Sequence, residues 1–242
     1  MRNKFLSIAF LGTIITLNAQ TTQTRPLTAF SKIQVADAVN VFYSTSDTLE
    51  VKVSGDEKEI ANVETKIEGS TLIISAKGKS KNPVNVYIKN KHLNDVVCSG
   101  ASSFKSLNTI KTDSISFTAS GASHISATVQ SKKINDAQRG ASEISLSGTT
   151  NELKAELSEA SSLKAYDLTS KKANVLTSGA SRANVNANEK LVANASGASN
   201  IRIKDEVKDI TADATLAASI SSMDEKISYG KDLNTHMNKG KK

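Results

Sequence analysis

The phrase Ser99-Gly-Ala-Ser102 is the stretch of sequence that decides the fold, because it recurs along the chain. Identical copies stand at 120–123, 178–181 and 196–199, and two variants, Arg139-Gly-Ala-Ser142 and Ser158-Glu-Ala-Ser161, lie between them. The second positions of the six copies are residues 100, 121, 140, 159, 179 and 197, which are 21, 19, 19, 20 and 18 residues apart. A tetrapeptide that recurs at a nearly constant step indicates a repeat architecture.

Around each phrase, apolar and polar side chains alternate. Four places after the second position stand Phe104, Ile125, Ile144, Leu163, Ala183 and Ile201. Six places after it stand Ser106, Ala127, Leu146, Ala165, Val185 and Ile203. A period of two is typical of a strand with one buried face. Because a unit of about 20 residues cannot bury that face alone, the units must stack on one another.

We therefore predict an all-β chain that folds as a right-handed parallel β-helix, a β-solenoid with about 20 residues per rung. We expect the Ala that follows the second position to point inward where the coil narrows, and the Ser after it to form a ladder of hydroxyl groups along an edge. The Gly has two open explanations, a positive φ at a corner or tight packing at a milder bend, since Glu159 replaces it in the fourth copy.

Residues 151–168 are the segment whose composition disagrees with the repeat. They are rich in helix-forming residues and contain apolar pairs four apart, such as Leu153 and Leu157. Their agreement with the alternating columns of the neighbouring units favours a strand, because tertiary context often overrides propensity.

The chain before Cys98 lacks the phrase, yet it alternates at 39–43, 49–53, 72–76 and 84–88. We expect one helical turn over 56–62 and a hairpin turn at Glu68-Gly69-Ser70. This part is either the irregular first rungs of the coil or an antiparallel sheet that caps it. At the other end, residues 205–230 are predicted to form a degenerate last rung that caps the C-terminus, with Ser219-Ile-Ser-Ser222 in place of the phrase.

Residues 1–19 are predicted to be a signal peptide. A basic start precedes an apolar run over 5–17 that is too short to span a membrane, and Ala19 suits the position before cleavage. The alternative is a buried N-terminal helix. Removal of Arg2 and Lys4 would lower the net charge from +7 to +5. We expect an exported, soluble protein of the periplasm or the cell surface, without a transmembrane segment and with a basic flexible tail at 231–242.

Composition limits the chemistry that the chain can perform. Aromatic residues make up 4% of the chain and there is one cysteine, which excludes a disulfide framework and a cysteine-based zinc site. The three histidines are too scattered for a local metal motif, so no metal or cofactor is expected. The basic residues are spread along the chain without an Arg-rich or aromatic-interleaved stretch, which argues against a nucleic-acid partner.

Four features together resemble a known family. They are Phe30-x-x-Ile33, the run Leu49-x-Val51-x-Val53-x-Gly55-Asp56, the run Gly69-Ser70-x-Leu72-x-Ile74 and the repeated Ser-Gly-Ala-Ser phrase. Over about residues 27–230 the chain resembles the family called "putative auto-transporter adhesin, head GIN domain". The resemblance implies an exported envelope protein of Gram-negative bacteria with a single-stranded right-handed β-helix, and it brings no catalytic residues. The last rung departs from the family, because a Gly-rich phrase is missing before Tyr229-Gly230.

A candidate site lies in the outward column three places after each second position. The column consists of Ser103, His124, Glu143, Ser162, Arg182 and Asn200. His124 and Glu143 should be neighbours on adjacent rungs, with Arg139 and Glu159 near by. They form either an acid–base or ligand-binding cluster, to which Arg182 would add a charge, or an ordinary surface ion pair.

Two other motifs have structural explanations. Ser102-x-x-Lys105 and Ser161-x-x-Lys164 match a penicillin-binding nucleophile motif by spacing, but that motif needs the start of a helix and these lie in strand repeats. Cys98 falls in an inward column, so a buried, inert thiol is expected.

Two functions follow from these observations. The first is a non-catalytic cell-envelope protein, an adhesin or scaffolding module that binds an envelope, glycan or protein ligand through the faces of the β-helix. This function is compatible with an oligomer. The second is a carbohydrate-active β-helix enzyme, lyase-like or hydrolase-like, that uses the region of His124 and Glu143. Because the faces should be shallow and poor in aromatics, we expect weak, multivalent contacts.

Overall fold

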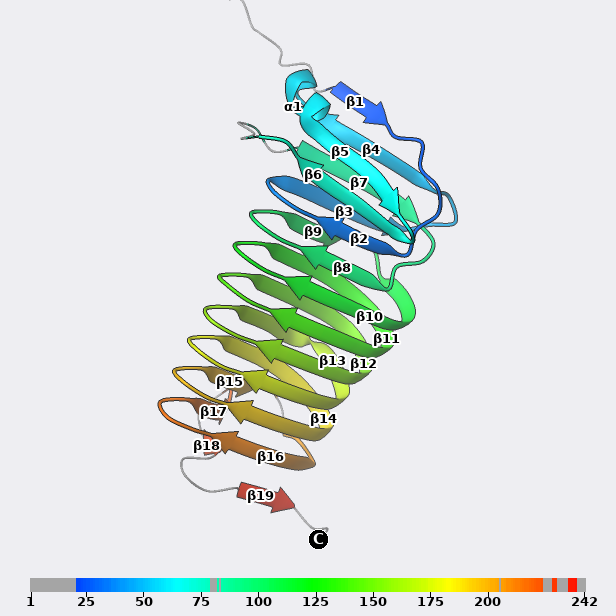
Figure 1. The fold of residues 1–242 in the computed structure, drawn as a ribbon. Helices are drawn as coiled ribbons and strands as arrows, with labels where there is room; N and C mark the ends of the chain where they lie inside the picture. Colours follow the sequence, from blue (N-terminus) through cyan, green and yellow to red (C-terminus); the bar gives the residue numbers. More distant parts are fainter. Residues whose placement is uncertain are drawn as a thin grey trace, which may run out of the picture.

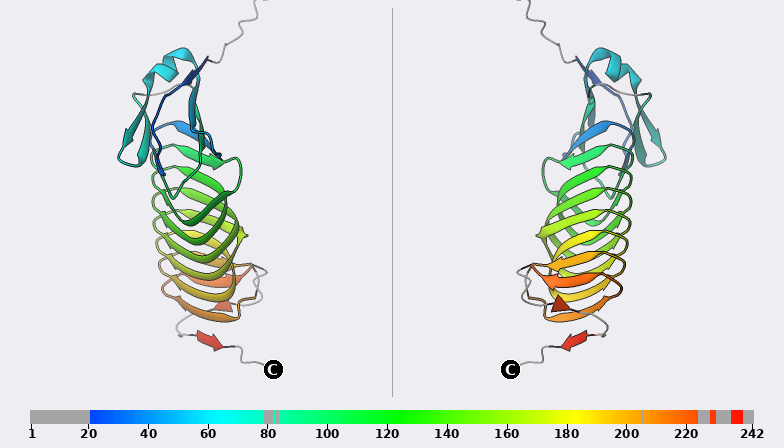
Figure 2. Two further views of the ribbon diagram at one scale, coloured as in Figure 1. Left: turned by 90° about the vertical axis from the view of Figure 1, so that its right-hand side faces the viewer. Right: turned by 90° about the vertical axis from the view of Figure 1, so that its left-hand side faces the viewer.

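The computed structural model describes residues 21–78, 82, 84–204, 206–223, 228–229 and 235–238. These residues form a β-solenoid of about seven turns, as predicted, which Figure 1 shows from the side and Figure 2 shows after a quarter turn. The strands of successive turns hydrogen-bond to one another and form one continuous sheet that winds around the core.

The regular part of the coil runs from residue 95 to residue 222. Its strands are β8 (Asp95–Cys98), β9 (Ser103–Ser106), β10 (Ile110–Ala119), β11 (His124–Gln138), β12 (Glu143–Leu157), β13 (Ser162–Thr177), β14 (Arg182–Ala195), β15 (Asn200–Ile203), β16 (Asp209–Ala214) and β17 (Ser219–Ser222). Neighbouring strands are parallel, and equivalent repeat positions face each other, as Ile125 faces Ile144. Residues 151–168, whose composition suggested a helix, lie mainly in β12 and β13, so the strand prediction is confirmed.

The core is the inside of the coil, and the alternating columns line it as predicted. All six residues four places after the second position of the phrase are fully buried. Beyond Ala119 the described core contains no aromatic side chain, whereas Tyr43, Phe104 and Phe117 fill the N-terminal end. The rings of Tyr43 and Phe104 stack with their centroids 5.9 Å apart.

The Ser-Gly-Ala-Ser phrase forms a corner between two strands, and its second residue has a positive φ. The five glycines at this position, Gly100, Gly121, Gly140, Gly179 and Gly197, have φ between 67° and 79°. Glu159 has φ 63° at the same position, so the bend is no milder there. Packing is also tight, since a Cβ on Gly140 would lie 2.8 Å from the carbonyl oxygen of Gly121. Both explanations of the glycine therefore hold.

The next two residues of the phrase point opposite to the prediction. The Ala side chains are exposed and the Ser side chains are buried in all six copies. The reason is that the Ser lies two residues before the buried column, in phase with it, whereas the Ala is out of phase. The hydroxyl groups also do not form a ladder with one another. Instead they bond to carbonyl oxygens at the corner, as when Ser161 Oγ donates to Ser158 O at 2.8 Å.

The region before Cys98 combines the two predicted alternatives. Its elements are β1 (Thr21–Thr24), β2 (Lys32–Val35), β3 (Val39–Thr45), β4 (Glu50–Gly55), α1 (Glu57–Asn62), β5 (Val63–Glu68), β6 (Thr71–Ala76) and β7 (Val84–Asn90). β2 and β3 pair in parallel with β8 and β9 on one side and with β6 and β7 on the other, so both pairs of strands extend the coil. β1, β4 and β5 pair antiparallel and, with α1, cover the end of the coil (Figure 1). The helical turn and the turn at Gly69, between β5 and β6, are confirmed.

The last turn of the coil is more regular than predicted. Thr215-Leu-Ala-Ala218, not Ser219-Ile-Ser-Ser222, occupies the corner, because Leu216 has φ 63° and Ala217 N donates to Gly197 O at 2.9 Å. Short antiparallel strands follow: β18 (Ser228–Tyr229) pairs with β17, and β19 (Thr235–Asn238) pairs with β16. Four residues of the segment predicted as a flexible tail are therefore strand, because they occupy the open edge of β16. The predicted signal peptide, 1–19, lies outside the described residues.

Candidate functional site

Outward side chains on one side of the coil form a continuous surface that we call the polar face. It consists of Ser103, His124, Glu143, Ser162, Arg182 and Asn200, and, two residues further along each strand, Lys105, Ser126, Ser145, Lys164, Asn184 and Arg202. In each of the two series, residues on successive turns lie side by side, about 4.8 Å apart. All twelve are at least partly exposed, so the core does not require their identity.

His124 and Glu143 meet on the polar face, as predicted. His124 Nδ1 lies 3.3 Å from Glu143 Oε1, and Lys164 Nζ lies 2.6 Å from Glu143 Oε2. Each oxygen of the Glu143 carboxylate thus contacts one nitrogen. The side chains are 45%, 30% and 56% exposed for His124, Glu143 and Lys164, a setting in which ion pairs contribute little to stability.

The other three predicted site residues do not join this cluster. Arg182 faces Ser162, which in turn faces Glu143, so Arg182 lies two turns away from the carboxylate. Arg139 and Glu159 lie at the corner, within the phrases that precede β12 and β13. Of the five residues predicted to form a cluster, only His124 and Glu143 are in contact, and Lys164, which was not predicted, joins them.

Arg139 and Glu159 instead line a shallow groove of about 770 Å³ beside the corner, which we call the corner groove. Its lining also includes Glu156 and the half-exposed Leu176. Glu156 pairs with Lys154 at 2.7 Å, whereas neither Arg139 nor Glu159 forms an ion pair with a described residue. The two residues by which the phrase departs from Ser-Gly-Ala-Ser thus share one surface.

A second hollow opens on the polar face where the repeat is interrupted. Ser145 faces Lys164 but Ser147 faces Asp167, so β13 carries an extra residue relative to β12. Relative to β14, residues 166–168 of β13 have no partners between Ala165 and Thr169. The bulge borders a hollow of about 440 Å³, the bulge hollow, lined by Ser126, Ala127, Ser145, Leu146, Ser147, Lys164, Tyr166, Asp167 and Asn184.

The residues of the bulge hollow were not predicted from the sequence. A signal for the bulge exists in the step of 20 residues from Glu159 to Gly179, which exceeds the neighbouring steps of 19 and 18. The length of a step does not say where in the turn the extra residue lies. Tyr166 is partly buried, and burial raises the pKa of its hydroxyl while nearby Arg202 opposes the shift.

Inside the coil, two neighbouring polar side chains of β11 stand at core positions that adjacent turns fill with apolar residues. Asp136 takes the core position of Phe117 and Ala155, and Gln138 takes that of Ala119 and Leu157. Gln138 Nε2 donates to Asp136 Oδ2 at 2.9 Å, whereas Asp136 Oδ1 and Gln138 Oε1 have no hydrogen-bond partner among the described residues. Burial raises the pKa of Asp136 to about 7, against the smaller opposite effect of the Gln138 hydrogen bond. In the same core, burial raises the pKa of the Cys98 thiol to about 12, which fits the expected inert role.

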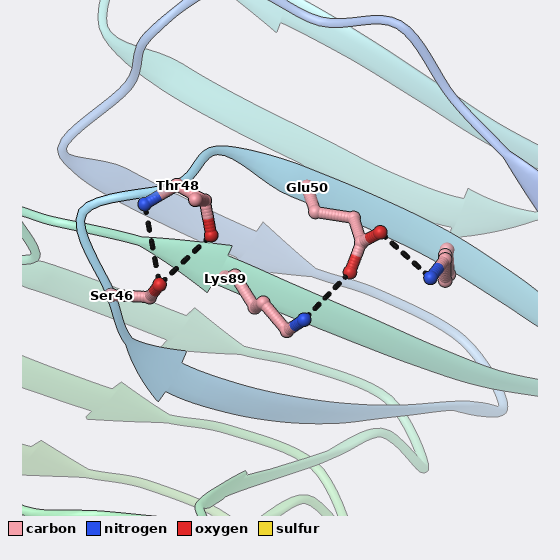
Figure 3. Close-up of polar contacts among 5 residues, drawn as sticks. Ser46, Thr48, Glu50 and Lys89 are labelled. Atoms are coloured by element: carbon pink, nitrogen blue, oxygen red, sulfur yellow. Dashed lines mark hydrogen bonds and ion pairs between the residues drawn. The ribbon is translucent and has the colours of Figure 1, made fainter.

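A third polar cluster lies on β4 and β7, near the N-terminal end of the coil (Figure 3). Glu50 lies between two lysines, with Lys52 Nζ 2.7 Å from Oε1 and Lys89 Nζ 3.1 Å from Oε2. These contacts lower the pKa of Glu50, Lys52 having the larger effect. Next to it, the hydroxyl groups of Ser46 and Thr48 are 2.9 Å apart and Thr48 N donates to Ser46 Oγ. The contacts of Glu50 link β4 to β7, and the contacts between Ser46 and Thr48 stabilise the loop after β3. Both have a structural role.

Neither a metal site nor a membrane helix is found in the described part of the chain. None of its His, Cys, Asp and Glu side chains gather in a group of three that could hold a metal ion. Within the same residues, no helix has the length and apolar character needed to cross a membrane.

Comparisons with solved structures reveal the same fold in other proteins. A "putative adhesin" from Bacteroides fragilis superposes with a TM-score of 0.75 at 18% identity, covering 85% of this chain and 97% of its own. A "putative lipid binding protein" from Parabacteroides distasonis gives 0.68 at 18% identity, covering 84% and 96%. A "putative adhesin" from Parabacteroides merdae gives 0.63 at 18% identity, with the same coverage. At these identities the likeness shows the fold alone.

Comparison at the level of sequence names the family. No curated protein matches the chain. A family model does match residues 29–206, which include the N-terminal strands from β2 onward and all six repeated phrases. The chain therefore belongs to the family described as "putative auto-transporter adhesin, head GIN domain".

Proposed function

We propose that this protein is an exported, non-catalytic module of the cell envelope that binds glycan or protein ligands through the outer faces of its coil. The observation that carries the proposal is the polar face. Its side chains stand at regular intervals on a hydrogen-bonded ladder and have no part in the core. A rigid scaffold that presents variable side chains is how many folds carry a binding function.

Membership of an adhesin family supports this proposal over an enzyme. A β-helix hydrolase would need one carboxyl group that gives up a proton and a second that acts as base or nucleophile. On the polar face both oxygens of Glu143 contact cationic or proton-donating nitrogens, His124 Nδ1 and Lys164 Nζ. Both oxygens are thus already engaged by neighbouring side chains, which supports a binding role.

The proposed location rests on the N-terminal residues. A basic start, a short apolar run and Ala19 before the first described residue are typical of a signal peptide. Mass spectrometry of the protein isolated from its native envelope would test this directly. We expect a chain that begins at Gln20, and recovery of the intact N-terminus in the cytoplasmic fraction would contradict export.

A binding and turnover screen tests the function. The purified mature chain, as a monomer and as a streptavidin-linked tetramer, is applied to arrays of glycans and of envelope and extracellular-matrix proteins, while product formation from polysaccharides is followed in parallel. We expect binding that the tetramer strengthens by 100-fold or more through avidity, of order 10²–10⁴, without turnover. Turnover that disappears in Glu143→Gln would instead establish the enzyme, and absence of binding to every probe would refute the binding module.

A further inference from the structure

We propose that the bulge hollow on the polar face is a binding site for an uncharged carbohydrate chain, with Tyr166 as the stacking surface. This inference rests on the proposed function, because it names the ligand class that one part of the polar face would bind. It is carried by four properties of the hollow: its aromatic wall, its hydroxyl and amide groups, its paired charges and its place at an interruption of the repeat.

Tyr166 is an unusual residue for this coil. Among the described residues from β9 to β17, the other aromatic side chains are Phe104 and Phe117, and both are fully buried. Tyr166 is partly exposed and lines the hollow together with Ala127 and Leu146. An aromatic side chain with an apolar body and a polar tip suits a ligand that has both apolar C–H faces and hydroxyl groups. The expectation of faces poor in aromatics therefore does not hold at this point.

The bulge itself explains how Tyr166 reaches the surface. An extra residue in a strand re-aims the side chains around it, and bulges recur next to functional sites. Here the interruption falls between Lys164 and Thr169, and within that stretch Ala165 and Leu168 remain fully buried. The core is thus conserved across the interruption, and what changes is the outer surface, where Tyr166 and Asp167 are displayed.

Polar groups that can bind hydroxyls line the remainder of the hollow. Ser126, Ser145 and Ser147 supply hydroxyl groups from two successive turns, and each hydroxyl can both donate and accept. Asn184 adds a neutral amide side chain to the lining. A mixed set of neutral donors and acceptors beside an apolar surface is typical of a small-molecule site.

The two charged residues that line the hollow, Lys164 and Asp167, are each already paired, which favours neutral over acidic sugars. Lys164 lies 2.6 Å from Glu143, and Asp167 lies 3.9 Å from Lys204. A uronate or a phosphate would have to compete with Glu143 for Lys164 and would approach the carboxylate of Asp167. Hexose or N-acetylhexosamine units carry no charge and avoid both costs.

The test uses the mature chain and an array of neutral and uronic-acid oligosaccharides, followed by titration calorimetry with the neutral oligosaccharide that binds best. We expect Tyr166→Ala to weaken binding about tenfold or more, since aromatic anchors dominate such sites. Tyr166→Phe should retain most of the affinity, because the ring surface is kept. Tyr87→Ala is the matched control, since Tyr87 is an exposed aromatic that stacks on Phe42 outside the hollow.

A second measurement does not depend on any variant folding correctly. Saturation-transfer and chemical-shift mapping on the wild-type chain should place the oligosaccharide against the Tyr166 ring and the Asn184 amide. Equal affinity of wild type and Tyr166→Ala, signals mapped elsewhere, or a preference for uronic-acid chains would overturn the carbohydrate site. If envelope or matrix proteins still bind in that case, the proposed function stands, whereas a chain that binds no probe at all removes both.

Discussion

The Ser-Gly-Ala-Ser corner and the polar face belong to the same turns of the coil, yet their residues are held by different forces. At the corner, a positive φ and a close backbone approach restrict the second residue, and a buried hydroxyl bonds to a carbonyl oxygen in the phrase, as in Ser161 to Ser158. On the polar face, residues in the same register vary freely, from His124 to Glu143 to Ser162.

The difference separates residues that build the coil from residues that are available for function. A repeated residue in this chain marks a backbone requirement, and a varied one marks a surface that the backbone leaves open. The chain breaks its own phrase at Arg139 and Glu159, and both residues line the corner groove. Substitutions at the corner should therefore affect stability, whereas substitutions on the face should affect binding.

Gly140→Ala is expected to have the largest effect on stability. An alanine there would need φ 79° and would place its Cβ 2.8 Å from the carbonyl oxygen of Gly121. Backbone strain and overpacking together should lower the free energy of unfolding by about 4 kcal/mol. Urea denaturation followed by circular dichroism measures the loss, with the exposed Ala141→Ser as control, expected within about 0.5 kcal/mol of wild type. Equal effects of the two variants would contradict the contrast.

Asp136 should make the core of the coil sensitive to pH. Its pKa is raised from 3.8 to about 7 in the folded chain, so the folded state keeps a proton that the unfolded state loses. The stabilisation is complete below about pH 4 and is lost as the pH rises to about 7, by about 3 kcal/mol. Denaturation from pH 4 to 8 tests this, and Asp136→Asn should remove most of the slope. A slope that is unchanged in the variant would refute the assignment.

Ser161→Ala should lower the free energy of unfolding by about 1.5 kcal/mol, because the Ser161 hydroxyl is buried and donates to Ser158 O at 2.8 Å. The matched control is the neighbouring Ser162→Ala on the polar face, which should change the free energy of unfolding by less than about 0.5 kcal/mol. Thermal melts of both variants would decide, and a larger loss for Ser162→Ala would reverse the proposed division between corner and face.

Glu159→Gly should raise stability by about 1 kcal/mol. Glu159 holds φ 63° where five other copies of the phrase have glycine, and a residue with a Cβ is strained in that conformation. Urea denaturation gives the stability, and the glycan and protein arrays give the binding. A variant that gains no stability would show that contacts of the Glu159 side chain in the corner groove offset its strain.

The smallest effect is expected for the ion pairs of the polar face. A double-mutant cycle with His124→Gln and Glu143→Gln should give a coupling energy below about 0.5 kcal/mol, since both side chains are substantially exposed. The coupling should fall further in 0.5 M salt, where the Debye length is short. A coupling that exceeds 1 kcal/mol and resists salt would indicate a buried, preorganised pair and would favour the catalytic alternative.

Much of the coil could be predicted from the amino-acid sequence, because each signal for it is local. The step between phrases sets the length of a turn, and the period of two places residues such as Ile125 and Leu163 inside. The orientation of the Ser-Gly-Ala-Ser phrase was predicted wrongly at Ala and Ser. Parity with the buried column would have corrected it, because a shift of one residue turns a side chain from the core to the solvent.

Other features depend on how the turns of the coil pack on one another, and no single segment of the sequence contains a signal for them. The division of the predicted site into the His124–Glu143 pair and the corner groove follows from the bend at the corner, which places residues three or four apart on different sides. The bulge at Tyr166 depends on which part of a long turn loses its register with both neighbours. Sequence by itself determined the repeat and the buried columns, because both arise from periods along the chain. Only the tertiary structure decided how the corners and the bulge divide the outward residues among separate surfaces, because that depends on the packing of turns about 20 residues apart.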